Sequence, residues 1–110
     1  FTYFQKRDFS VIKNHLFTNL LFVDDAIAGY SHLDRDTDKV WFGICIAEQH
    51  KGKKLGELLI RHTIEQANLN NIKPIYLSVY KDNLPAIKLY EKVGFIKYYE
   101  NELSFFMKKE

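Results

Sequence analysis

The sequence lacks several features that would assign a function directly. Its single cysteine, Cys45, excludes an intrachain disulfide and a zinc cluster of several cysteines. No apolar run approaches the ~18 residues of a membrane-spanning helix. The net charge is only +2, and no nucleic-acid-binding motif accompanies it. We therefore expect neither a membrane nor a nucleic acid as a partner.

No signal-peptide pattern, internal repeat, low-complexity tract or linker interrupts the chain. Its 110 residues are enough for one hydrophobic core, so we predict a single domain over residues 1–110. The single cysteine and the absence of a leader pattern predict a cytoplasmic location. Aromatic residues make up 15% of the chain, so much of the core must be aromatic.

Hydrophobic patterning predicts strands in the first half. A short edge strand at residues 1–5 and an irregular or briefly helical segment at 7–15 precede a meander of three strands. These three strands are predicted at 16–25, 26–34 and 40–46, with the first turn near Asp24-Asp25. The last of the three is mostly apolar, so we expect it to be buried on both faces.

The second half alternates helices and strands. A helix is predicted after residue 55, because apolar residues at helical spacing form one face there: Gly56, Ile60, Ile64 and Ala67. A strand at 73–80 precedes a second helix, which Asn83 can cap, with Pro85 in its first turn and Gly94 at its end. A closing hairpin is predicted from the strands at 95–100 and 103–109.

The order of these elements indicates an α+β fold, a mixed α/β layer structure. The strand–helix–strand unit in the middle implies one parallel pair inside a mostly antiparallel sheet.

The basic segment Lys51-Gly52-Lys53-Lys54-Leu55-Gly56 lies where a strand leads into a helix. The N–H groups and the dipole at a helix start attract anions, and glycines let the backbone approach a ligand closely. The segment therefore suits a pyrophosphate, although it is neither a Walker loop nor a dinucleotide fingerprint. A solvated basic turn is the alternative on this segment alone.

The segment that follows the next strand decides between these alternatives. Here the sequence resembles the GNAT superfamily of acyl-CoA-dependent N-acetyltransferases, from about residue 17 to the C-terminus. The family motif Asn-x-x-Ala-x-x-Leu-Tyr-x-x-x-Gly-Phe is matched at Asn83, Ala86, Leu89, Tyr90, Gly94 and Phe95. The family's pyrophosphate loop, Gln/Arg-x-x-Gly-x-Gly/Ala, aligns with the basic segment, but Lys51 replaces Gln/Arg and Lys54 replaces the central glycine.

The resemblance implies a GNAT-like sheet whose parallel pair splays apart, with helices on both faces. GNAT domains normally carry one or two helices between their first two strands, and these help to form the acceptor site. This sequence departs from that pattern, because only about ten residues separate its first two predicted strands, so we expect a shortened N-terminal region. Acetyl-CoA, the acetyl donor, would lie between the splayed strands and transfer its acetyl group directly to an amine. The resemblance implies backbone contacts to acetyl-CoA from Ile44, Cys45 and Ile46 and a contact from Asn83. It also implies pyrophosphate contacts from Lys51, Gly52, Lys53, Lys54, Leu55 and Gly56. No metal is implied.

The resemblance identifies Tyr90 as the general acid that protonates the leaving thiolate, in contact with the cofactor. Packing on the sheet is the alternative role for this tyrosine. Many family members use a glutamate of the central strand as base, but this strand has no carboxylate. Glu48, His32, His50, His15 or a water chain remain open as the base.

An enzyme is the leading hypothesis, with a primary amine as acceptor: a metabolite, an amino sugar or a protein. The alternative is a non-catalytic GNAT-like module that binds acyl-CoA or docks a partner. The lysine at position 54, the absent strand carboxylate and the missing acceptor-side helices favour that alternative. A basic protein that binds nucleic acid is a third, weaker interpretation. Because the short N-terminal region leaves one side uncovered, we also expect that the chain can form a homodimer.

Overall fold

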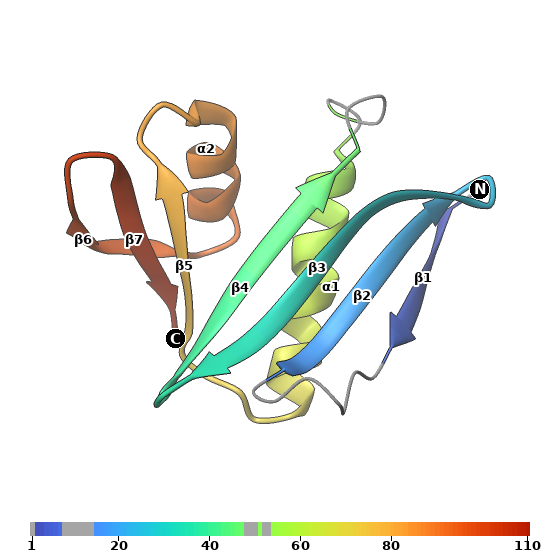
Figure 1. Ribbon diagram of the computed structural model, residues 1–110, viewed down its shortest axis with the longest axis horizontal. Helices are drawn as coiled ribbons and strands as arrows, with labels where there is room; N and C mark the ends of the chain where they lie inside the picture. Colours follow the sequence, from blue (N-terminus) through green and yellow to red (C-terminus); the bar gives the residue numbers. More distant parts are fainter. Residues whose placement is uncertain (1, 8–14, 48–50, 52–53) are drawn as a thin grey trace.

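The computed structural model describes residues 2–7, 15–47, 51 and 54–110, with side chains from Leu16 onward. In these ranges the chain forms seven strands and two helices (Figure 1). The elements are β1 (Thr2–Arg7), β2 (His15–Val23), β3 (Ala26–Asp36), β4 (Lys39–Ile46), α1 (Leu55–Leu69), β5 (Ile75–Tyr80), α2 (Leu84–Lys92), β6 (Ile96–Glu100) and β7 (Ser104–Lys109). Neither described helix is long and apolar enough to cross a membrane.

All seven strands join one sheet in the order β1-β2-β3-β4-β5-β7-β6. Neighbouring strands are antiparallel except β4 and β5, which pair in parallel at only two positions, Val40 with Ile75 and Trp41 with Tyr76. Beyond these positions the two strands diverge, as Figure 1 shows. The predicted mixed sheet with one splayed parallel pair is therefore confirmed.

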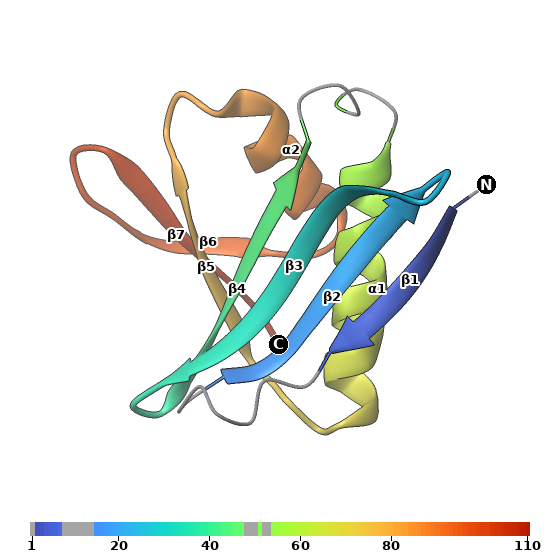
Figure 2. The same ribbon diagram turned by 45° about the vertical axis from the view of Figure 1, so that its right-hand side comes forward.

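Both helices lie on the same face of the sheet, behind it in Figure 1 and in Figure 2. One core cluster joins the buried residues of the two helices to alternate positions of β4 and β5. The expectation that helices cover both faces is therefore wrong for the described residues. The reason is that α1 turns Ile60 and Ala67, and α2 turns Ile87 and Tyr90, toward the same buried side of the strands.

The other side of the sheet, which we call the open face, carries no described helix. Along β4, Val40 and Phe42 are buried toward the helices, whereas Cys45 on the open face is exposed. The prediction that this strand is buried on both faces is therefore wrong. Among the described residues, side chains of the strands themselves cover this face, such as the Trp41 ring, whose centroid lies 5.7 Å from that of Tyr76.

The hairpin turns follow from residues that accept positive φ. Asp24 and Asp25, at φ 50° and 68°, form the two-residue turn between β2 and β3 at the predicted place. Two consecutive left-handed residues match the right-handed twist of the flanking strands. The second turn is shorter than predicted: β3 continues to Asp36 and β4 begins at Lys39.

The N-terminal region between the first two strands is short, as the sequence predicts. β1 ends at Arg7 and β2 begins at His15, and the two strands pair directly. The segment predicted to be irregular or helical was 7–15. Its first and last residues belong to β1 and β2, and residues 8–14 lie outside the described ranges.

A buried polar network fixes α1 against the sheet. The Nδ2 group of Asn19 on β2 donates to Oε1 of Gln66 at 2.8 Å and lies 3.5 Å from Oγ of Ser31 on β3. Oγ of Ser31 lies 2.6 Å from Oγ1 of Thr63, which donates to the carbonyl of Leu59 at 2.9 Å. Buried polar groups are costly when left unpaired, so this network favours one register of α1 on the strands.

Candidate active site

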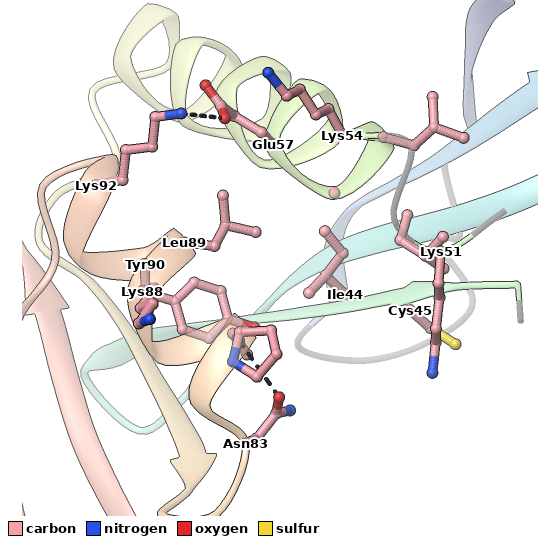
Figure 3. A pocket seen from close by; sticks show the side chains of 15 residues that line it. Ile44, Cys45, Lys51, Lys54, Glu57, Asn83, Lys88, Leu89, Tyr90 and Lys92 are labelled. Carbon is pink, nitrogen blue, oxygen red and sulfur yellow. Dashed lines mark hydrogen bonds and ion pairs between the residues drawn. The ribbon is translucent and has the colours of Figure 1, made fainter.

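A cavity of about 810 Å³ opens where β4 and β5 diverge. β4 forms one wall, and the start of α1 and one side of α2 form the others (Figure 3). The lining residues are Ile44, Cys45, Ile46, Lys51, Lys54, Leu55, Gly56, Glu57, Asn83, Pro85, Ala86, Lys88, Leu89, Tyr90 and Lys92. The cavity thus brings together the two segments that the sequence identified separately, the basic segment and the α2 motif.

The edge of β4 that faces the cavity has free backbone positions. On its other edge β4 stays paired with β3 as far as Ile46, opposite Gly29. Toward β5, pairing ends at Trp41, and no described strand pairs with this edge at Ile44, Cys45 or Ile46. Backbone N–H and C=O groups at such an edge can accept an extended ligand as an added strand.

The backbone at the start of α1 has the conformation that a glycine would favour. Lys54, which replaces the family's central glycine, has φ 60° and ψ 17°, in the left-handed region. The first helical hydrogen bond runs from the N–H of Leu58 to the carbonyl of Lys54 at 3.2 Å. The N–H groups of the three residues before Leu58 have no partner within the helix and are available to an anion.

The cavity carries more positive than negative charge. The described lining residues include Lys51, Lys54, Lys88 and Lys92, and Glu57 is the one carboxylate among them. Glu57 is already engaged: its Oε1 accepts from Nζ of Lys92 at 2.8 Å, and its Oε2 accepts from Nε of Arg61 at 3.0 Å. The hydrogen bond from Lys92, followed by that from Arg61, lowers the pKa of Glu57. This excess of positive charge among the described lining residues suits an anionic ligand.

Asn83 caps α2 at the rim of the cavity, as predicted. Its Oδ1 accepts from the N–H of Ala86 at 3.3 Å, and Pro85 stands in the first turn. The far end of α2 also behaves as predicted, because Gly94 adopts a φ of 109° and the N–H of Phe95 bonds to the carbonyl of Tyr90 at 2.9 Å. The cap and the glycine fix the position of α2 beside the cavity.

Tyr90 presents a neutral phenol to the cavity. The residue is 8% exposed, and its ring packs edge-on against Phe42 and Phe95, with centroids 6.3 Å and 6.0 Å away. In Figure 3 the ring extends from α2 toward Ile44 on β4. Burial raises the pKa of Tyr90 above its usual value of 10.0, because the phenolate would be poorly solvated. The hydroxyl is therefore a proton donor over the whole neutral range.

His32 does not line this cavity. It lies on the open face, on the other side of β4 from the helices, beside Gly43. Glu48, Gly52, Lys53 and His50 lie outside the described residues, as does the side chain of His15. Of the predicted cofactor residues, the structure brings together Ile44, Cys45, Ile46, Lys51, Lys54, Leu55, Gly56, Asn83 and Tyr90.

Several lining residues were not predicted from the sequence. Lys88 and Lys92 are spaced four apart on α2, and this spacing alone would have placed them on one face. Glu57 and Leu89 also line the cavity. Within the described ranges, no group of three or more His, Cys, Asp or Glu side chains is arranged to hold a metal ion.

Comparison with known families identifies the chain. It matches the Acetyltransferase (GNAT) family over residues 2–95, and it therefore belongs to that family. The fold agrees: the GNAT-family acetyltransferase from Streptococcus pneumoniae superposes with a TM-score of 0.77 at 27% sequence identity, covering 91% of this chain and 69% of that one.

Two further proteins are similar to parts of the chain. Spermine/spermidine N(1)-acetyltransferase from Bacillus subtilis is 36% identical over 74 residues, which are 66% of this chain and 47% of that protein. The chain thus spans about half the length of this relative. The N-acetyltransferase PseH from Campylobacter jejuni, solved in complex with acetyl coenzyme A, shares the fold with a TM-score of 0.77 at 22% identity, covering 92% of this chain and 71% of that one.

Proposed function

We propose that the chain transfers an acetyl group from acetyl-CoA to a primary amine by direct attack in a ternary complex. The observation that carries the proposal is the cavity at the diverging β4 and β5, which combines a basic helix start with the phenol of Tyr90. A phosphate-bearing thioester needs both features, an anion site for its pyrophosphate and a proton donor for its sulfur.

The donor would lie along β4. Its pantetheine amides would pair with the free backbone edge at Ile44, Cys45 and Ile46. Its pyrophosphate would accept hydrogen bonds from the backbone N–H groups around Lys54 and Gly56. Lys51, and Gly52 and Lys53 outside the described residues, would also contact it. The Nδ2 group of the capping Asn83 would contact the pantetheine arm, since the cap uses only the Oδ1 of this residue.

The reaction consumes an ammonium and a thioester and yields an amide, a thiol and one proton. A base removes the first proton from the ammonium, and the amine lone pair then attacks the thioester carbonyl carbon. The new C–N bond forms, the C–S bond breaks, and Tyr90 Oη donates its proton to the departing sulfur. The nitrogen releases its second proton to solvent, from which Tyr90 recovers its own. Glu48, His32 and a water chain are the candidate bases.

The proposed acceptor is an amine, and no described residue of the cavity distinguishes one class of amine from another. An amine with a lysine-like pKa of ~10.4 arrives protonated, so a base is required at neutral pH. The relative from Bacillus subtilis is named for spermine and spermidine, which makes polyamines a reasonable first class of acceptors.

The test is release of the CoA thiol from acetyl-CoA over a panel of amines. The panel contains spermine, spermidine, free amino acids, amino sugars and lysine peptides, with mass spectrometry of each acceptor. We expect at least one amine to become acetylated in proportion to thiol release. Thiol release without acetylated amine would mean hydrolysis, and saturable binding without release would support the non-catalytic acyl-CoA-binding module.

A further inference from the structure

The side chain of His32 occupies the space above Gly43. The two residues are register partners on β3 and β4, and both point to the open face. A Cβ atom built on Gly43 would lie 2.1 Å from Nε2 of His32 and 2.6 Å from its Cε1. No side chain other than hydrogen fits there, so the glycine lets the imidazole lean across β4.

This position is next to the candidate active site. Gly43 directly precedes Ile44, the first β4 residue that lines the cavity. The sheet order β3-β4-β5 means that a ring leaning from β3 over β4 leans toward the opening between β4 and β5. Nε2 is the ring atom closest to Gly43, one residue before the β4 positions that line the cavity.

Asp34 lies close to the other ring nitrogen of His32, Nδ1. Its Oδ2 lies 2.7 Å from Nδ1 of His32, two residues along the same strand. Nδ1 is buried and forms no aligned hydrogen bond, so the interaction is one of close charge rather than of ideal geometry. A carboxylate at this distance attracts a proton on Nδ1 and repels a lone pair there. In the neutral ring this charge favours the tautomer with the proton on Nδ1 and the lone pair on Nε2.

The side chain of His32 is partly exposed to water, and the described residues that surround it are mostly uncharged. The side chains of His32 and Asp34 are 35% and 42% exposed. The Tyr30 ring stacks on His32 with a centroid distance of 6.3 Å. The register partner of His32 on β2 is the neutral Thr18, that of Asp34 is His15, and Cys45 is the next open-face residue of β4 beyond Gly43. Among these groups, Asp34 is the carboxylate that faces the ring.

We infer that His32 is the general base of the reaction, that Asp34 is its positioning residue, and that the amine acceptor approaches from the open face. The inference rests on the proposed function and chooses among the bases it left open. Nε2 takes one proton from the acceptor ammonium, giving a neutral amine and an imidazolium whose Nδ1 faces Asp34. The amine then attacks as described above, and the imidazolium returns its proton to solvent.

The test compares His32→Gln, Asp34→Asn and Gly43→Ala with the control Asp36→Asn. Asp36 lies on the same strand and its substitution removes the same charge. Gly43→Ala displaces the imidazole without changing either member of the pair. For each variant we would measure acetyl-CoA affinity by calorimetry and kcat against pH with the best amine of the panel.

We expect His32→Gln to lower kcat by about 10²-fold or more and to remove the rate increase near neutral pH that an imidazole base produces. Gly43→Ala should reproduce this defect, Asp34→Asn should lower kcat about tenfold, and all variants should keep the wild-type acetyl-CoA affinity. Asp36→Asn should match the wild type. An unchanged pH profile in His32→Gln would overturn the inference.

A second measurement does not depend on turnover. Nitrogen NMR of the imidazole ring should show the neutral His32 protonated on Nδ1, with Asp34→Leu shifting the proton to Nε2. A proton on Nε2 in the wild type would contradict the role of Asp34. If the wild type transfers no acetyl group, the proposed function and the base role fail together, whereas normal transfer by His32→Gln overturns the base role alone.

Discussion

Gly56 at the start of α1 and Leu89 on α2 approach each other across one wall of the cavity. A Cβ atom built on Gly56 would lie 3.4 Å from Cδ2 of Leu89 and 3.9 Å from Cγ1 of Ile46. Gly56 does not have a positive φ, so its role here is to leave space between α1 and α2. A single methyl group just fits at this position, whereas a branched side chain does not.

Gly56→Val should therefore weaken acetyl-CoA binding. The extra methyl groups would enter the cavity at the pyrophosphate end, and overpacking of this kind costs about 1–3 kcal/mol, or roughly 5- to 150-fold in affinity. Calorimetric titration checks this, with Gly56→Ala as the matched control that should bind nearly as well as the wild type. Equal affinity of the valine variant would place the phosphates elsewhere.

Tyr90→Phe should separate turnover from binding. The phenyl ring keeps the edge-on contacts with Phe42 and Phe95, so the fold and the acetyl-CoA affinity should persist. Loss of the proton donor should lower kcat by about 10²- to 10⁴-fold. Unchanged kcat in steady-state assays would remove Tyr90 from the mechanism.

The raised pKa of Tyr90 also predicts how stability depends on pH. The folded state binds the phenolic proton more tightly than the unfolded state, whose tyrosine pKa is close to 10.0. The stabilisation is therefore complete below pH ~10 and is lost as the pH rises through the folded-state pKa. Chemical unfolding between pH 8 and 12 should show a fall in unfolding free energy that is reduced in Tyr90→Phe. The same fall in both proteins would show that other groups cause it.

Asn83 should have two separable roles. Asn83→Ala removes the cap on α2 and should cost about 1 kcal/mol of unfolding free energy. Asn83→Asp keeps an oxygen for the N–H of Ala86 but loses the Nδ2 donor and adds a negative charge. It should keep the wild-type stability and bind acetyl-CoA more weakly. Wild-type binding by the aspartate variant would limit Asn83 to capping.

Lys54→Gly tests whether the lysine acts through its charge. Glycine adopts a φ of 60° without strain, so the backbone at the start of α1 should stay the same while the positive charge is lost. Acetyl-CoA affinity should fall about two- to fivefold at low salt, and the difference should shrink at high salt. Lys54→Arg is the control that keeps the charge. A salt-independent loss would point to a change in the loop itself.

Much of the fold could be predicted from the sequence because its local signals agree. The aspartate pair at 24–25, the cap at Asn83 and the glycine at 94 each mark an end of an element, and the structure places ends there. Coverage of both faces by helices was wrong, because it came from the family resemblance rather than from helical patterns in this chain.

The candidate site could be predicted only where residue type and spacing define it. Lys54 was identified at the helix start, but its left-handed conformation depends on the surrounding loop and not on the lysine itself. Lys88 and Lys92 resemble any solvated helix face until α2 is placed beside α1. The relation of His32 to Gly43 depends on strand register, which the sequence leaves open.

The most direct test of the account is calorimetric titration of acetyl-CoA into the wild-type chain, with ATP as the comparison. We predict saturable one-to-one binding of acetyl-CoA, much weaker binding of ATP, and a loss of affinity in Gly56→Val that Gly56→Ala does not show. Absence of acetyl-CoA binding, or equal binding by the valine variant, would contradict the assignment of the cavity between β4 and α2 as the acetyl-donor site.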